Sequence, residues 1–327
     1  MKAPEYPLSV ILLTHNQADI LRMQIIALER QQNIKASDFE IIVTDDSSRP
    51  DEIRKIRSIL ANTTLTCHLL RQQSDRFRAA KARNSAIRVA KGNLLLFLDG
   101  DMIPEVDALS KHVLMQEGKK GHVIAGHRLR RRIEPQGDGG VWDFDQILHL
   151  CRTSDLIDPV IARWQQAEDQ KRIEFLQSAH PWRVVFSCHM SVRAAPEIAF
   201  DENFIGWGPE DWELAYRLTH RHGYTVDFAP HITAYEVDHL GQGVGNVFRV
   251  RTQMAIIDYV RNTFYFFDRC PGLGVEEVFW GLRKLELRGN EWVVTPTNKD
   301  CDINQRITEA RSWLAANKHY TTSVSFQ

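Results

Sequence analysis

Short apolar runs alternate with segments of helical spacing through the first hundred residues. Four of these runs are too short for a typical helix, so we expect them to be strands. They cover residues 8–13, 40–43, 65–70 and 94–98. Helical patterns fill the intervals; Pro50 suits the first turn of one helix, and Gly92 suits the end of another. Strands that alternate with helices imply right-handed crossovers and a mostly parallel sheet flanked by helices, so we expect an α/β fold with a Rossmann-like, nucleotide-binding half over residues 1–125.

The fourth run ends in two aspartates separated by one glycine, Asp99-Gly100-Asp101. In open α/β sheets, ligands bind at the carboxyl ends of the strands. Carboxylates suit a hard divalent cation, and a cation held by one or two of them can also bind phosphate oxygens. A turn with two solvated acids is the alternative. No Gly-x-Gly-x-x-Gly follows the first run, so the dinucleotide-binding fingerprint is absent.

A second group of acids lies more than one hundred residues later, after a Gly-Trp-Gly sequence centred on Trp207. The glycines permit a tight turn around the tryptophan. Glu210 and Asp211 then fall in the first turn of a helix that ends near His222, with Gly223 as its cap. Adjacent helical residues do not share a face, so at most one of the two acids is expected to point at a reacting group. The alternative is that both complement the helix dipole.

The composition is that of an ordinary globular protein, with 43% hydrophobic and 25% charged residues among 327. A net charge of −1 gives no electrostatic reason to expect nucleic acid as a partner. The five cysteines are scattered, which favours neither a zinc site nor a disulfide framework. Neither a secretory signal nor an apolar run of the roughly 18 residues needed to span a membrane is visible. We expect a cytoplasmic protein, with peripheral contact at the inner face of the membrane left open.

The rest of the chain is less informative. Helical spacing is visible over residues 158–176, and residues 184–192 are expected to be a strand. The arginines of residues 128–132 are expected to lie in a solvated loop, with phosphate binding as the alternative. The aromatic stretch 264–267 is expected on a helix packed over the core, with membrane docking as the alternative.

The N-terminal half resembles glycosyltransferase family 2, which has the GT-A fold. Four blocks carry the resemblance, in the family's order and spacing: residues 9–16, 43–48, 82–87 and 96–101. Residues 204–214 are similar to the Gly-Trp-Gly-x-Glu-Asp block of β-1,4-galactosyltransferases and of bacterial chondroitin and hyaluronan polymerases. The resemblance implies a GT-A domain over residues 1–245, whose acceptor-binding half is 126–245, followed by a helical extension over 246–327.

The resemblance also implies roles for particular residues. The donor-binding residues would be Thr14, His15, Asp45, Asp46, Arg76, Lys81, Arg83, Asp99, Gly100 and Trp207. Within that set, Asp46 would contact uracil. The family more often has a tyrosine at the position of His15, which is a departure in the loop that borders the base. Asp101 and His239 would hold Mn²⁺ or Mg²⁺, with His231 as the rival histidine.

The implied reaction moves a hexose from a UDP-sugar to a hydroxyl of a glycan or polysaccharide acceptor, which could be lipid-linked. The metal would neutralise the charge that develops on the leaving diphosphate. The acceptor hydroxyl needs a base during attack; by resemblance the base is Asp211, with Glu210 positioning the acceptor or the loop, and a single base implies inversion. The rivals are a sugar nucleotidyltransferase, which should carry a glycine-rich signature after its first strand, and a non-catalytic nucleotide- or glycan-binding module, which needs no base. The sugar, the linkage and the oligomeric state stay open.

Overall fold

The computed structural model describes residues 4–133, 143–153, 159–239, 253–270, 285–288, 291–294 and 302–316. The chain divides into two compact units. The first comprises Met1–Glu202 and Asp211–Gly243, and the second comprises Asn203–Glu210 and Val244–Gln327. Among the helices in these described ranges, none is long and apolar enough to cross a membrane.

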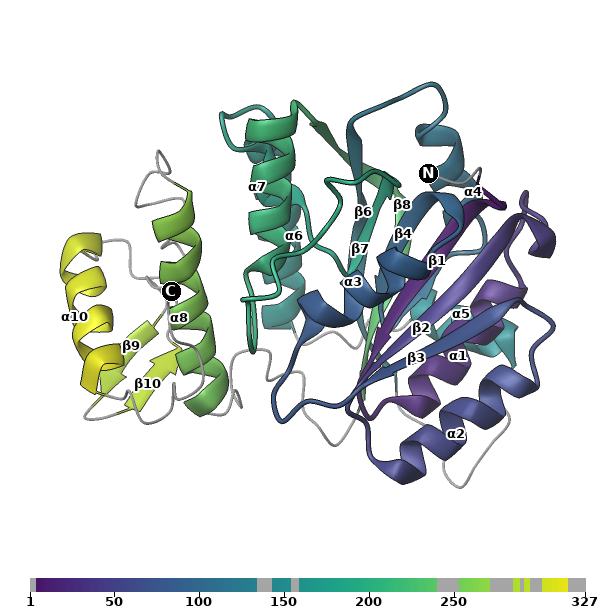
Figure 1. The fold of residues 1–327 in the computed structure, drawn as a ribbon, viewed down its shortest axis with the longest axis horizontal. Helices are drawn as coiled ribbons and strands as arrows, with labels where there is room; N and C mark the ends of the chain where they lie inside the picture. The colour runs from purple at the N-terminus through teal and green to yellow at the C-terminus, as the bar shows by residue number, and fades with distance from the viewer. Residues whose placement is uncertain are drawn as a thin grey trace. The chain divides into compact units, whose positions relative to one another are not determined.

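The first unit is built on an eight-stranded sheet of order β3-β2-β1-β4-β7-β6-β8-β5 (Figure 1). The strands are β1 (Tyr6–Thr14), β2 (Phe39–Asp46), β3 (Cys67–Gln72), β4 (Gly92–Asp99), β5 (Met102–Pro104), β6 (His122–Ile133), β7 (His189–Arg193) and β8 (Thr225–His239). Strands β1 to β4 run parallel to one another, as do β6 and β8. Strand β7 is antiparallel to both of its neighbours, and β5 is antiparallel to β8. The expected α/β fold with a mixed, mostly parallel sheet is confirmed.

Helices cover both faces of this sheet (Figure 1). They are α1 (Ala18–Glu29), α2 (Pro50–Ala61), α3 (Ala79–Val89), α4 (Ala108–Met115), α5 (Phe144–Thr153), α6 (Pro159–Leu176) and α7 (Glu210–His222), with short 3-10 turns η1 (Ala36–Asp38) and η2 (Pro181–Val184). The main core lies between α1, α2 and alternate residues of the parallel strands; Leu21 of α1 and Ile56 of α2 pack there with Val10, Ile41 and Leu96. Helix α7 ends as expected, because Gly223 has a left-handed φ of +69°.

The structure corrects the expected role of Gly92. Helix α3 ends before it, at Val89, and Gly92 is instead the first residue of β4. A Cβ at this position would lie 2.3 Å from the backbone nitrogen of Ser9 on β1. Glycine is therefore required by the close approach of two strands and not by the end of a helix.

The expectation of one strand over residues 184–192 is also wrong in its first part. The 3-10 turn η2 ends at Val184, and β7 begins only at His189. Val184 and Val185 are buried, so the apolar run marks a buried segment that makes no ladder of strand hydrogen bonds. A short apolar run predicts burial more reliably than it predicts the backbone conformation.

The second unit contains helices α8 (Gln253–Arg269) and α10 (Ile303–Ala316) and an antiparallel hairpin of β9 (Leu285–Arg288) and β10 (Glu291–Val294). The helices match the expected helical extension, whereas the hairpin was not expected. Phe264 is buried, and the guanidinium of Arg311 on α10 lies 4.3 Å from its ring centroid. The aromatic stretch therefore contributes to packing within this unit.

Candidate active site

Several predicted site residues meet where the parallel strands end. In the strand register, Thr14 on β1 stands beside Asp45 on β2. On the other side of β1, Leu13 stands beside Asp99 on β4. The predicted nucleotide-binding residues on these three strands thus lie together at the carboxyl ends of the strands. This is where open α/β sheets bind ligands.

The Asp99-Gly100-Asp101 turn is fixed by close packing and by a buried amide. A Cβ on Gly100 would lie 2.5 Å from the carbonyl oxygen of Leu13, so only glycine fits between the two aspartates. The side-chain amide of Gln24, on α1, donates to the carbonyl oxygens of Asp99 at 2.9 Å and of Met102 at 2.8 Å. Sequence reasoning missed Gln24, although a polar residue in the apolar stripe of a helix was a usable signal.

The two halves of this motif have different partners. The Asp99 carboxylate accepts a hydrogen bond of 2.7 Å from Arg83 on α3, and the Arg83 side chain is buried. Arg83 also lies 5.3 Å from the centroid of the Phe200 ring. Arg83 was predicted to lie near the donor diphosphate; in the structure it fixes Asp99, so its charge is directed at the motif.

The predicted base-contacting acids brace the loops around them. One carboxylate oxygen of Asp46 accepts from the Gln72 amide at 2.7 Å, and the other accepts from the Arg78 backbone at 2.7 Å. Asp45 accepts from the backbone N–H of Ser48 at 3.3 Å. The His15 Nδ1 lies 2.5 Å from the carbonyl oxygen of Asp46, which requires the proton on Nδ1. These hydrogen bonds connect the loops that follow β1 and β2 to each other and to the segment before α3.

Thr14 differs from these acids. Its hydroxyl is buried, and among the described residues it has no hydrogen-bond partner. Buried hydroxyls are usually paired, and this one stands at the edge where a donor would bind. Two basic residues were also predicted to lie near the diphosphate. Lys81 is on α3, and Arg76 precedes that helix and is partly buried, which lowers its pKa.

Asp101 lies beside strand β8. Its carbonyl oxygen accepts a 2.8 Å hydrogen bond from the backbone of Val237, and its neighbour Met102 stands opposite Glu236 in the strand register. Burial, followed by the negative charges of Glu236 and Asp99, holds the pKa of the Asp101 carboxyl well above its usual range. The acid on β8 that influences Asp101 is therefore Glu236, which sequence reasoning did not select.

Neither of the two histidines predicted as metal ligands has a described side chain that contacts Asp101. His239 is the last residue of β8, and its side chain lies outside the described residues. The rival, His231, has an exposed side chain, and Lys111 donates to its carbonyl oxygen at 3.0 Å.

The donor set around Asp101 fits a divalent cation shared with a substrate. Within the described ranges, no three histidine, cysteine, aspartate or glutamate side chains form a group that could hold a metal by themselves. Mg²⁺ and similar hard ions are commonly held by one or two carboxylates, with phosphate oxygens completing the coordination. Asp101 and Glu236 supply such carboxylates, and a bound cation would offset the repulsion from Glu236 that, after burial, raises the pKa of Asp101.

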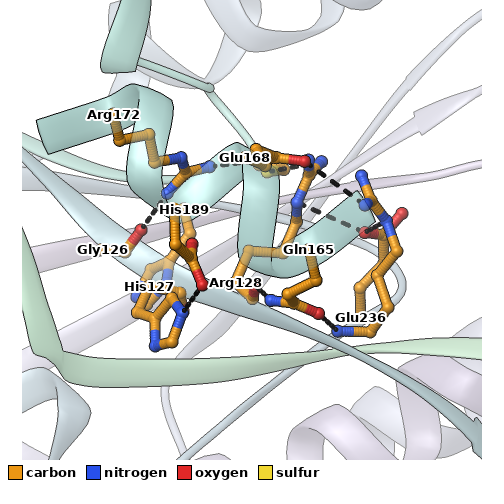
Figure 2. A network of polar contacts seen from close by, with 11 residues as sticks. Gly126, His127, Arg128, Gln165, Glu168, Arg172, His189 and Glu236 are labelled. Atoms are coloured by element: carbon orange, nitrogen blue, oxygen red, sulfur yellow. Dashed lines mark hydrogen bonds and ion pairs between the residues drawn. The ribbon is translucent and has the colours of Figure 1, made fainter. Parts of the chain in front are cut away.

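The arginines of residues 128–132 correct another expectation. They lie on strand β6 and not in a solvated loop. The guanidinium nitrogens Nε of Arg128 and Arg130 approach Glu236 at 3.4 and 3.1 Å, and both arginines also reach Glu168 on α6 (Figure 2). The side chains of Arg128 and Arg130 are thus mostly buried, and acids on two distant elements balance their charge.

The predicted base lies at the start of α7. Asp211 accepts a 2.8 Å hydrogen bond from the backbone N–H of Trp212. The Trp212 ring lies 6.2 Å from the Phe186 ring, and Arg128 lies 5.0 Å from the centroid of Phe186. Successive contacts thus connect the residue after Asp211 to the arginine that binds Glu236. Glu210, the other predicted acid, is buried.

The Gly-Trp-Gly segment lies in the second unit, where helix α8 holds it. Asn262 on α8 donates to the carbonyl oxygens of Ile205 at 3.0 Å and of Trp207 at 3.3 Å. The Trp207 ring lies 4.9 Å from the ring of Tyr259, and 38% of Trp207 is exposed. A Cβ on Gly206 would collide with Asp258, so this glycine is needed for the approach to α8.

The comparisons agree with this geometry. The model of the glycosyl transferase family 2 matches residues 9–177. The validoxylamine A glucosyltransferase of Streptomyces hygroscopicus subsp. jinggangensis is 28% identical over 297 residues, which cover 86% of this chain and 65% of the relative. The hyaluronan synthase of Pasteurella multocida is 29% identical over 72% of this chain and 25% of its own length. The chain therefore spans less than two thirds of either relative.

Among solved structures, the mannosyltransferase PcManGT of Pyrobaculum calidifontis, in complex with GDP-Man and Mn²⁺, has a TM-score of 0.55 and 15% identity. The match covers 98% of this chain and 79% of that one, and it supports the GT-A fold. Because the family model spans more than half of its residues, the chain belongs to glycosyltransferase family 2, and it has the GT-A fold.

Proposed function

We propose that this glycosyltransferase is a metal-dependent, inverting hexosyltransferase that uses a UDP-sugar and a hydroxyl of a glycan or polysaccharide acceptor. The observation that carries the proposal is the arrangement of acids at the carboxyl edge of the sheet. Asp99 is neutralised by Arg83, whereas Asp101 lies beside a second acid, Glu236, and Asp101 itself forms no ion pair with an arginine of the described residues. A carboxylate in that setting suits a cation shared with a diphosphate.

On the donor side, the loops after β1 and β2 would receive the nucleobase. The buried Thr14 hydroxyl is available to pair with it, and Asp46, held by Gln72 and Arg78, would border it. His15 orients this loop through the backbone of Asp46. Asp99 would contact the ribose or the donor sugar, with its orientation set by Arg83 and by the Gln24 amide.

Asp101, with Glu236 or His239 from strand β8, would hold Mn²⁺ or Mg²⁺. When bound, such an ion acts as a Lewis acid and neutralises the charge that builds on the departing diphosphate. Arg76 and Lys81 would supply further positive charge near the diphosphate; burial of Arg76 strengthens its attraction for an anion, because a partly buried charge is less screened.

On the acceptor side, Asp211 would take the proton of the attacking hydroxyl. Its position in the first turn of α7 leaves the carboxylate partly exposed, while the buried Glu210 would brace the turn. The acceptor oxygen, as it loses its proton to Asp211, attacks the anomeric carbon opposite the departing diphosphate, and this single displacement inverts the configuration.

The direct test incubates the full chain with Mn²⁺ and a panel of UDP- and GDP-sugars, with oligosaccharide acceptors or water, and measures nucleoside diphosphate release. We expect turnover with at least one UDP-sugar, and losses of at least about a hundredfold in Asp101→Ala and Asp211→Asn. Asp227→Asn is the matched control, because this exposed acid pairs only with His122 and Lys119 in the described structure. Equal turnover in all four proteins would contradict the proposed roles of Asp101 and Asp211. Turnover with GDP-sugars alone would contradict the proposal that the donor nucleotide is UDP.

A further inference from the structure

Helix α6 contacts the sheet through polar side chains at helical spacing. Gln165, Glu168, Asp169 and Arg172 follow the i, i+3, i+4, i+7 pattern that normally carries apolar residues. Each has a partner on strand β6: Gln165 bonds the backbone of Arg128 and Arg130, Asp169 bonds His127 at 3.0 Å, and Arg172 donates to the carbonyl oxygen of Gly126 at 3.3 Å (Figure 2). The helix is therefore placed by specific polar contacts.

Glu168 is the central acid of this interface. Its carboxylate oxygens lie 2.8 Å from Arg128, 3.3 Å from Arg130 and 3.1 Å from Arg172. Burial alone would raise the pKa of Glu168, but the three guanidiniums around it hold that pKa far below its usual range. Glu168 is thus ionised and neutralises part of the positive charge of its neighbours.

Two of these arginines are shared with the active site. Arg128 and Arg130 each contact both Glu168 and Glu236, and Glu236 is the acid that acts on Asp101. Glu168 thus gives these two arginines a second carboxylate, which they share with Arg172. Without Glu168, both guanidiniums would have Glu236 as their remaining carboxylate among the described contacts, and their positive charge would oppose a cation at Glu236 and Asp101.

We propose that Glu168 is a positioning residue of the donor site: it neutralises Arg128 and Arg130, so that the Glu236 and Asp101 carboxylates stay available to a divalent cation. This inference rests on the proposed metal-dependent function. When a residue that orients a metal ligand without touching the metal is replaced, the affinity for the metal falls by about ten- to a hundredfold. Glu168 acts from another helix through the arginines and touches neither the cation nor the substrate.

The test is a titration of the full chain with Mn²⁺ alone, in which electron paramagnetic resonance measures the free ion. We expect Glu168→Gln to bind Mn²⁺ at least about tenfold more weakly than the wild type. Asp169→Asn is the matched control, because it removes a charge from the same face of α6 but contacts only His127 among the described residues, and we expect its affinity to stay within about twofold of the wild type.

A double variant separates charge balance from damage to the fold. Glu168→Gln combined with Arg130→Gln removes one negative and one positive charge, so we expect Mn²⁺ affinity to recover to within about threefold of the wild type. Loss of folding would not produce this recovery. Unchanged affinity in Glu168→Gln, equal loss in Asp169→Asn, or no recovery in the double variant would overturn the inference. A wild type that binds no Mn²⁺ would instead overturn the metal-dependent part of the proposed function.

Discussion

Strands β6 and β8 meet apolar packing on one side and a charged interface on the other. Tyr235 and Val237 of β8 belong to an apolar cluster with Ile147 and Leu148 of α5. Glu236, between them in sequence, instead faces the arginines of β6 that contact helix α6 (Figure 2). The same two strands are thus held by non-directional burial on one face and by paired charges on the other.

The difference concerns what each kind of interface can do. Apolar contacts stabilise in proportion to the area buried, and they tolerate substitutions of similar volume. A buried ion-pair network adds little net stability, but the loss of one member leaves its partners charged and unpaired. We therefore expect substitutions on the α5 side to change stability alone, and substitutions on the α6 side to change both stability and the position of the Glu236 carboxylate.

The largest expected effect on stability comes from breaking the charged side. Arg128→Leu removes the guanidinium shared by Glu168 and Glu236, and we expect the free energy of unfolding to fall by about 3–5 kcal/mol. Urea denaturation measures this change. Arg88→Leu is the control, because the Arg88–Glu202 pair is exposed and its loss should cost less than about 1 kcal/mol. An equal fall in the free energy of unfolding in the two variants would show that the Arg128 ion pairs contribute no more to stability than an exposed pair does.

The apolar side should respond in stability alone. Ile147→Ala opens a cavity in the cluster on α5, where Ile147 is fully buried, and we expect a loss of about 3 kcal/mol. Turnover per folded molecule and Mn²⁺ affinity should stay at wild-type values, since the apolar cluster that contains Ile147 includes none of the proposed site residues. If Ile147→Ala lowered Mn²⁺ affinity as much as Glu168→Gln does, the two faces would not differ in their influence on the metal site.

A smaller effect is expected from pH. Next to the charged interface, the buried His112 and His189 rings meet at 3.0 Å through their Nε2 atoms, and burial lowers the pKa of His189 to about 4. Below the unfolded pKa of about 6.5, the unfolded chain binds a proton that folded His189 does not, so stability falls as the pH drops from about 6.5 to 4. From this residue we expect a loss of roughly 2 kcal/mol between pH 7 and pH 5.

Urea denaturation at the two pH values measures this loss. His189→Gln should reduce the pH dependence, whereas His220→Gln should leave it unchanged, because His220 is an exposed residue near the end of α7. If the pH dependence were the same in all three proteins, His189 would not be its source.

The sequence predicted the apolar elements of the nucleotide-binding half far better than the charged interface between α6 and the sheet. The strands and helices of the nucleotide-binding half were foreseen because their apolar periodicity follows burial, as with Leu21 and Ile25 on α1. Helix α6 was also foreseen, but its contacts were not, because the side chains that face the sheet are polar. No periodicity indicates that Arg128 on β6 pairs with Glu168 forty residues later.

Within the candidate site, the motif residues were found and their supports were not. Asp99 and Asp101 follow a recognisable strand, whereas Gln24 and Glu236 reach them from distant elements. Such residues become visible only when the fold brings separate elements together. Gly100 belongs to the motif that the sequence revealed, but only the structure explains it, because a side chain at this position would collide with the carbonyl oxygen of Leu13.

The central claim is that Asp101 binds a cation that is shared with the donor diphosphate. Calorimetric titration of the wild type and of Asp101→Asn with UDP, each with and without Mn²⁺, tests it most directly. We predict that Mn²⁺ raises the affinity of the wild type for UDP by at least about tenfold and leaves that of Asp101→Asn unchanged. Equal UDP affinity of the wild type with and without Mn²⁺, or the same enhancement in Asp101→Asn, would contradict the claim.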